Sequence, residues 1–362
     1  MDAIATEPME QLLALYARYK DWVATQTVDQ SDVTHHYRIP PTCTMDFASY
    51  TALPFRLFDD DEVQAIFRFL VDGPQNDGER AIHSYVSHVL TARFENLANR
   101  ALQDDMEILS IGSDCLPRII FSKWGIQRTR MFGKLSYPFD LALVQPKAAL
   151  RLVAQDFNGL VDRSSLSYLA GYDYPINTRD GFIFNHESGG EWIANDFARL
   201  ISLYTRRVRD FRASVGNEKH KIFLFNYCDR FTGDAAQFFR AGGLTPQQDY
   251  DAEARNLLVT ATQSLAARTS GKIAVLCVVS GYVGPDAPVV QLEEFVVDGA
   301  LVRVVRVPRP TSTYTFYDPA DYAAASGLEF ERAIVAALGD IAAAVFPQME
   351  PISSGVDIAR CG

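Results

Sequence analysis

One cysteine, Cys115, stands at a position in the sequence where a thiol can become reactive. The apolar residues 108–111 predict a short buried strand. The loop after it begins with Gly112, Ser113 and Asp114. Pro117 is favoured in the first turn of a helix, because its missing N–H would be unpaired there in any case. We therefore expect Cys115 where a strand turns into a helix over residues 118–126, whose N–H groups and positive dipole end favour a thiolate. The alternative is a buried structural cysteine.

Polar side chains also follow the other predicted strands. They are Asn185, His186 and Glu187 after residues 181–184, Cys228, Asp229 and Arg230 after 221–227, and Ser280 and Gly281 after 272–279. Sites in an open parallel sheet gather outside the carboxyl ends of the strands, so we expect these groups to share one edge with Cys115. His186 would then take the thiol proton, and the helix start would offer N–H groups to an oxyanion. Asp229 or Asp140 would orient the imidazole. His186 could instead be an ordinary hydrogen-bonded loop histidine.

Residues 136–140, Ser-Tyr-Pro-Phe-Asp, form a second motif. Pro138 restricts Tyr137 to an extended conformation. A buried Phe139 would place the Asp140 carboxylate beside an apolar wall, where it needs a partner. Candidate partners are Arg128, Arg130 and His186. The alternative is a turn whose aspartate caps the helix that begins near residue 146.

Substrate contacts are expected from residues around these motifs. They are Gly112, Ser113, Asp114, Tyr137, Asn185 and Arg206. Arg206 belongs to a helix with three further arginines, which could bind an anion or form a solvated face paired with nearby acids. Neither a phosphate loop nor a Gly-x-Gly-x-x-Gly fingerprint is present, so we expect no nucleotide or other cofactor. Zinc-ligand spacing is also absent, and we expect no metal. The nearest approach to such a pattern is the weak cluster of His35, His36 and Cys43.

The order of apolar segments predicts an α/β protein with a mostly parallel central sheet flanked by helices. We expect a helical N-terminal region over residues 1–104 and an α/β catalytic domain over 105–362. Strands are predicted at 108–111, 181–184, 221–227, 272–279 and 301–307, with helices near 146–156, 190–213, 250–268 and 328–346. Short apolar runs without strict alternation indicate strands buried on both faces.

Composition narrows the class of partner. The chain has 362 residues, 48% hydrophobic and 22% charged, and a formal charge of −11, which argues against nucleic acid and anionic membrane surfaces. Its five cysteines form no C-x-x-C pair, which favours a reducing compartment, and the start of the chain is not a secretory signal. We expect a cytoplasmic protein acting on a small-molecule, peptide or carbohydrate substrate. The oligomeric state stays open, a homo-oligomer included.

Five segments together resemble a bacterial family of unknown function that is described as papain-like cysteine peptidases. They are 109–115 (Leu-Ser-Ile-Gly-Ser-Asp-Cys), 136–140, Asp156-Phe157, Phe184-Asn185-His186 and 206–211 (Arg-Arg-Val-Arg-Asp-Phe). The resemblance covers roughly residues 106–230. It implies that Cys115 is the nucleophile and His186 the base. Leu141 replaces the tryptophan that the family carries after Pro-Phe-Asp, which would change the pocket.

Three functions remain open from the sequence. The first is a thiol-dependent hydrolase or acyl transferase acting on an amide or ester through Cys115 and His186. The second is a transferase for a sugar or other polar group in the same crevice, which Tyr172, Tyr174, Arg206 and Tyr227 could line. The third is a non-catalytic binding module in which the N-terminal helices dock a partner.

Overall fold

A computed structural model describes residues 6–25, 66, 69–70, 72–73, 77–128, 135–169, 171–284, 287–316 and 318–355. Its central feature is a five-stranded sheet in the order β1-β6-β7-β9-β8. The strands are β1 (Met106–Gly112), β6 (His220–Tyr227), β7 (Ile273–Val279), β9 (Ala300–Arg306) and β8 (Val290–Val297). The first four are parallel, and β8 runs antiparallel to β9 at one edge. This confirms the predicted α/β class and its mostly parallel sheet.

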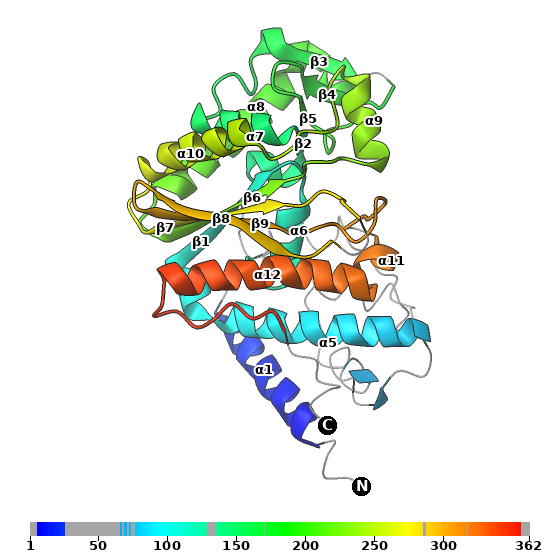
Figure 1. Ribbon diagram of the computed structural model, residues 1–362, viewed down its shortest axis with the longest axis vertical. Helices are drawn as coiled ribbons and strands as arrows, with labels where there is room; N and C mark the ends of the chain where they lie inside the picture. The colour runs from blue at the N-terminus through cyan, green and yellow to red at the C-terminus, as the bar shows by residue number, and fades with distance from the viewer. Residues whose placement is uncertain are drawn as a thin grey trace.

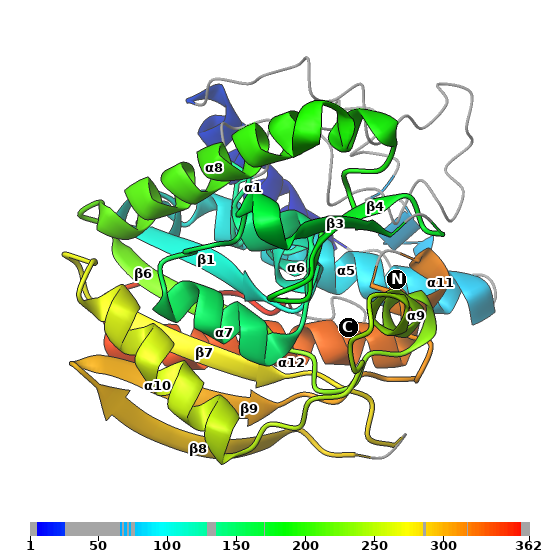
Figure 2. The same cartoon turned by 90° about the horizontal axis from the view of Figure 1, so that it is seen from above.

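Helices cover both faces of this sheet (Figures 1 and 2). One face packs against α7 (Pro146–Ala154), α8 (Ala194–Gly216) and α10 (Ala252–Ala266). The other packs against α5 (Asp77–Ala98), α6 (Leu116–Lys123), α11 (Pro319–Tyr322) and α12 (Ala325–Val345), with α1 (Thr6–Ala24) outside α5. Alternate residues of the four parallel strands enter the two cores, so these strands are continuous apolar runs in the sequence.

A second, smaller sheet lies beside the carboxyl end of β1. It is antiparallel, in the order β2-β5-β4-β3, and consists of β2 (Leu143–Val144), β5 (Phe182–Ile183), β4 (Tyr174–Asn177) and β3 (Leu166–Leu169). Helix α9 (Gly233–Ala241) packs on it through a third apolar cluster that includes Ile176 and Phe239. The N–H of Val144 donates to the Ser113 carbonyl (2.9 Å), which ties this sheet to the residue that follows β1.

The N-terminal helices share a core with the α/β part of the chain. Tyr16 and Tyr19 of α1 pack against Phe94 of α5, and α5 residues join one apolar cluster with α6, α12 and the sheet. The Asn96 amide of α5 donates to the carbonyls of Trp124 (2.8 Å) and Ser353 (2.9 Å). The sequence-based boundary at residue 104 thus lies within one continuous core.

Most predicted elements are present, with one important correction. The runs near 108–111, 221–227, 272–279 and 301–307 are strands of the central sheet, and the four predicted helices are α7, α8, α10 and α12. The run 181–184 is not a central strand: its β5 pairs antiparallel with β2 and β4. Within the predicted helical N-terminal region, residues 26–65 lie outside the described residues. Among those residues, no helix has the length and apolar character that a membrane crossing requires.

Candidate functional site

Cys115 is the residue that caps the amino end of α6. Its carbonyl accepts the Ile119 N–H (3.1 Å), and Pro117 stands in the first turn, as the sequence predicts. Gly125, with φ of +67°, follows the helix and lets the chain leave it. The eight-residue helix is therefore bounded at both ends by local sequence, and this fixes Cys115 beyond the carboxyl end of β1.

The thiol is in its neutral form, which corrects the expectation of a thiolate. Cys115 is 9% exposed, and burial, followed by the nearby Asp114 carboxylate, raises its pKa far above the usual value. The backbone N–H of Cys115 itself and the charge of Arg309 lower the pKa but do not compensate. Ionising a desolvated sulfur beside a carboxylate costs more free energy than ionising a sulfur at an exposed helix end.

Alkylation of Cys115 should therefore depend steeply on pH. Because only the thiolate reacts, the rate with iodoacetamide should rise about tenfold per pH unit between pH 7 and 9 without levelling off. Site-resolved mass spectrometry of the alkylated peptide measures this rate. A plateau below pH 8 would mean that the thiolate is stabilised after all.

Asp114, predicted to contact substrate, is bonded within the protein. It is 3% exposed, and Oδ1 accepts from the Leu116 N–H (3.1 Å) and from Asn226 Nδ2 (2.6 Å). Oδ2 accepts from Arg309 Nη2 (2.5 Å). These partners come from α6, from β6 and from the segment after β9, so Asp114 connects the Cys115 turn to the rest of the carboxyl edge.

Gly112 and Ser113 also have structural roles. A Cβ on Gly112 would lie 2.6 Å from the Asn226 carbonyl oxygen, so only glycine allows β1 and β6 to approach this closely. The Ser113 hydroxyl donates to that carbonyl (2.9 Å) and accepts from the Cys228 N–H (3.1 Å). Both residues hold the strand ends together. Their described interactions are all within the protein, and none of them supports the predicted substrate contacts.

His186 reaches the neighbourhood of Cys115 by a different route from the one predicted. It follows β5 of the small sheet, so it does not stand at the carboxyl edge of the central sheet. The route runs through hydrogen bonds: Val144 of β2 bonds to the Ser113 carbonyl, and Leu143 pairs with Ile183 of β5. His186 is exposed, and buried Cys115 lies near it.

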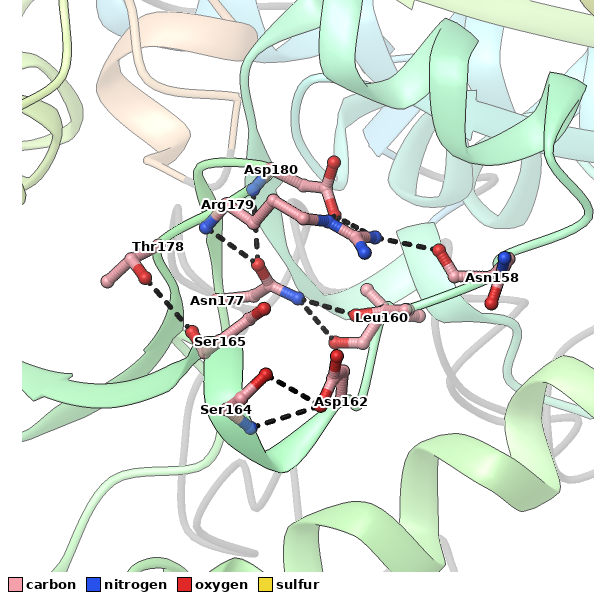
Figure 3. Close-up of polar contacts among 10 residues, drawn as sticks. Asn158, Leu160, Asp162, Ser164, Ser165, Asn177, Thr178, Arg179 and Asp180 are labelled. Atoms are coloured by element: carbon pink, nitrogen blue, oxygen red, sulfur yellow. Dashed lines mark hydrogen bonds and ion pairs between the residues drawn. The ribbon is translucent and has the colours of Figure 1, made fainter.

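The hairpin that leads into β5 is held by buried polar contacts (Figure 3). Asn177 is fully buried, and its Nδ2 donates to the carbonyls of Gly159 (2.9 Å) and Leu160 (2.8 Å). Its Oδ1 accepts the N–H groups of Arg179 (3.0 Å) and Asp180 (3.1 Å). One side chain thus fixes the turn between β4 and β5 against the segment after α7.

Replacing Asn177 with alanine should destabilise the protein by about 1–3 kcal/mol, because it leaves buried backbone groups without partners. Chemical denaturation of the full chain measures this. Thr178, whose exposed hydroxyl donates to the Ser165 carbonyl (3.1 Å) in the same turn, provides the control. Thr178→Ala should cost well under 1 kcal/mol, and equal losses in both variants would contradict the assignment.

The Asp140 carboxylate belongs to its own turn. It is 1% exposed, accepts the Tyr137 N–H at Oδ2 (2.8 Å) and also accepts from the Ser110 hydroxyl. It caps the short 3-10 helix Pro138–Leu141, which supports the capping alternative, although the capped helix is this one rather than α7. The Tyr137 hydroxyl donates to Glu107 (2.9 Å) near the start of β1. Tyr137 therefore points toward the opposite end of that strand from Cys115.

Asp229, the other predicted orienter, pairs with Arg306. Its Oδ2 accepts from Arg306 Nη1 (2.9 Å), and it is 2% exposed. Oδ1 is buried and has no hydrogen-bond partner in the described part of the chain. Asp229 does stand at the carboxyl edge, after β6, as predicted, but its charge is balanced by an arginine from β9.

The two residues next to His186 differ in burial and in partners. Asn185 is half-buried, and its Oδ1 has no partner among the described residues. Glu187 is buried and pairs with Arg207 (3.0 Å), while the Tyr204 hydroxyl donates to it (3.2 Å). Burial outweighs the attraction of Arg207 and raises the pKa of Glu187.

Arg206, predicted to bind substrate, is exposed on α8, and the inward-facing arginine is its neighbour Arg207. The tyrosines named for a transferase pocket also have protein partners. Tyr227 donates to the Asp249 carbonyl (3.0 Å), and Tyr172 and Tyr174 pack against Phe238.

Sequence reasoning missed the residues that join the strand ends. Asn226 and Arg309 are both buried, and Ser280, which was noticed only as a strand end, donates to Asn226 Oδ1 (2.6 Å). Asn226 interrupts an apolar strand, and Arg309 closely follows one. A polar residue inside such a run is the signal that could have identified Asn226.

A cavity of about 450 Å³ lies at the other, amino edge of the central sheet, among residues such as Asp104, Lys219, His220 and Phe346. It includes none of the predicted site residues. Within the described segments, no three His, Cys, Asp or Glu side chains are grouped to hold a metal ion, and His35, His36 and Cys43 lie outside those segments.

Comparison with known proteins adds no family assignment. No protein-family model matches the chain, and neither a curated protein nor a solved structure matches it. The resemblance to the bacterial family therefore depends on the motifs quoted above.

Proposed function

We propose that this protein is a thiol-dependent hydrolase or acyl transferase acting on an amide or ester, with Cys115 as nucleophile and His186 as general base. The observation that supports the proposal is that Cys115, in the turn after β1, lies near His186, in the turn after β5. The resemblance to the bacterial family, which implies the same two residues, supports it.

The proposed chemistry moves one proton and one acyl group. His186 takes the thiol proton while the Cys115 sulfur attacks the carbonyl carbon, and the resulting imidazolium then protonates the leaving amine or alcohol. The sulfur is left as a thioester. Water or another acceptor, deprotonated by His186, attacks this thioester and releases the acyl product, and the proton returns to the thiol.

Because the pKa of the Cys115 thiol is raised, the proposed reaction depends strongly on a general base. A thiol that is neutral at rest must lose its proton during the attack itself, so a hydrogen-bonded base is required at that moment. Of the N–H groups at the start of α6, that of Leu116 already bonds Asp114, and Pro117 has none. Stabilising the oxyanion would therefore fall to the N–H groups of Cys115 and Arg118. The tetrahedral intermediate is anionic, and a helix start favours that charge.

Covalent capture tests the proposal. The full chain is incubated with p-nitrophenyl acetate, quenched in acid, and digested for mass spectrometry. We expect an acetyl group on Cys115, and its loss in His186→Asn. His220→Asn, which changes a histidine at the amino edge of the sheet, is the matched control and should keep the adduct. Acetylation of Cys115 at equal rates with and without His186 would refute the proposed base.

Group transfer without a covalent intermediate is the second candidate. The observation that favours it is the neutral state of the buried Cys115 thiol, since a protonated sulfur is a poor nucleophile. The buried Asp229 oxygen that lacks a partner in the described part of the chain could then accept a proton from a polar acceptor. This candidate predicts catalysis that survives Cys115→Ala and is lost in Asp229→Asn.

A further inference from the structure

The turn that presents Cys115 is fixed from a distance by one arginine. Arg309 lies on the segment after β9, is 8% exposed, and donates through Nε to the Ser280 carbonyl (3.0 Å) at the end of β7. Its Nη2 donates to Asp114 (2.5 Å), the residue directly before Cys115. A planar guanidinium that bonds two groups at once holds their relative positions more rigidly than a lysine could.

The Asp114 carboxylate transmits this restraint to the helix that Cys115 begins. Its Oδ1 accepts the Leu116 N–H (3.1 Å), the first donor after the cysteine, and also bonds Asn226 (2.6 Å). Asn226 in turn accepts the Ser280 hydroxyl (2.6 Å). The bonds form a closed circuit through Asp114, Asn226, Ser280 and Arg309, and all four residues are buried.

We propose that Asp114 and Arg309 are the positioning pair of the Cys115 site, holding the turn that aims the sulfur and setting the charge around it. This inference rests on the proposed function, because it concerns how that nucleophile is placed. It assigns a role to Arg309 that neither its place in the sequence nor the motifs indicate. Neither residue is assigned a contact with substrate.

The charges of Asp114 and Arg309 shift the pKa of the Cys115 thiol in opposite directions, which makes the pair testable. Asp114 raises the pKa of the Cys115 thiol, second only to burial, and Arg309 lowers it. Asp140 is the third charged group that acts on the thiol, and it also raises the pKa. A residue with a merely structural role would expose the thiol when removed, whatever its charge.

The experiment measures the iodoacetamide rate at Cys115, resolved by peptide mass spectrometry, from pH 7 to 9 in the full chain. Asp114→Asn keeps the shape and removes the negative charge, and should react about threefold faster at each pH, because the larger thiolate fraction outweighs the weaker nucleophile. Arg309→Met should react about threefold more slowly, and Arg309→Lys should recover part of the rate. Asp234→Asn and Arg240→Met, both exposed on α9, are the charge-matched controls and should react like the unchanged protein.

Faster labelling in both Asp114→Asn and Arg309→Met, or no change in either, would overturn the positioning pair. Thermal melting identifies a variant that has not folded. If Arg309→Met does not fold, Arg309→Lys and Asp114→Asn decide the question, and a rate in Arg309→Lys equal to or above that of the unchanged protein counts against the pair. Failure of the proposed function looks different. Activity would then survive Cys115→Ala, while the opposite effects of the two charges on labelling would persist.

Discussion

Cys115→Ala is expected to reduce ester hydrolysis by at least about 10³-fold, the loss typical of removing a covalent nucleophile. Without the sulfur no thioester forms, and the remaining groups can only bind substrate. Cys115→Ser should be nearly as inactive, since a hydroxyl has a far higher pKa than a thiol and His186 would have to deprotonate it. Steady-state kinetics with a series of p-nitrophenyl esters measures the loss in kcat/KM.

Cys277→Ala is the matched control for that experiment. Cys277 is another buried cysteine whose thiol pKa is raised by burial, but it lies within β7 among apolar side chains. Its replacement should cost some stability and leave kcat/KM within about twofold. Equal rates in Cys115→Ala and in the unchanged protein would leave the non-covalent candidate, and an absence of turnover on every ester and amide would favour a binding module.

Glu331→Leu should destabilise the protein by about 3–5 kcal/mol, because it leaves a buried lysine without its counter-charge. Glu331 of α12 pairs with Lys123 of α6 (2.7 Å), and both side chains are fully buried. It also accepts the Trp124 indole N–H (2.9 Å). Among the described residues, Lys123 would keep the Phe316 carbonyl (3.0 Å) and the face of the Tyr322 ring in the variant.

The stability lost in Glu331→Leu should depend on pH, and the direction follows from the pKa of Lys123. Burial already lowers the pKa of Lys123, and Glu331 opposes that effect. Without Glu331 the folded-state pKa falls further below the unfolded value, so the unfolded chain binds more protons in the window between the two. Stability must therefore rise with pH across that window. Urea unfolding at pH 6 and pH 9 should show the larger deficit at pH 6.

The double variant Lys123→Met with Glu331→Leu separates charge from packing. It should recover most of the lost stability, since replacing both members of a buried pair by apolar residues is often neutral. The control is the exposed pair Glu294 and Arg303 on neighbouring strands (2.7 Å), where Glu294→Leu should cost less than about 1 kcal/mol. A buried-pair loss no larger than this control would contradict the argument.

The sequence predicted the elements that local pattern controls. Four of the central strands appear where apolar runs stand without alternation, because both of their faces are buried. Pro117 located the start of α6, and with it the place of Cys115 after β1. Strand β8 was not predicted, because its mixture of Glu and apolar residues, with a bulge between Gln291 and Glu293, has no clear period.

The candidate site could be predicted only in part, because apolar runs do not say which sheet a strand joins. Residues 181–184 were correctly read as containing a strand, yet β5 pairs with β2 rather than with the central strands. His186 therefore approaches Cys115 from the small sheet. The partners of Asp140 and Asp229 also could not be predicted from the sequence, since Ser110 and Arg306 lie far from them along the chain.

The sequence by itself determined the class of fold, the strand–turn–helix that holds Cys115, and the polar residues that follow each strand. Each of these depends on a few neighbouring residues and on how often apolar side chains recur. Only the tertiary structure decided that the thiol is neutral, that Asp114 is bonded to Arg309 across 195 positions, and that Arg207 rather than Arg206 turns inward. The protonation of a buried group depends on its desolvation and on every nearby charge, and these are contributed by segments that only folding brings together.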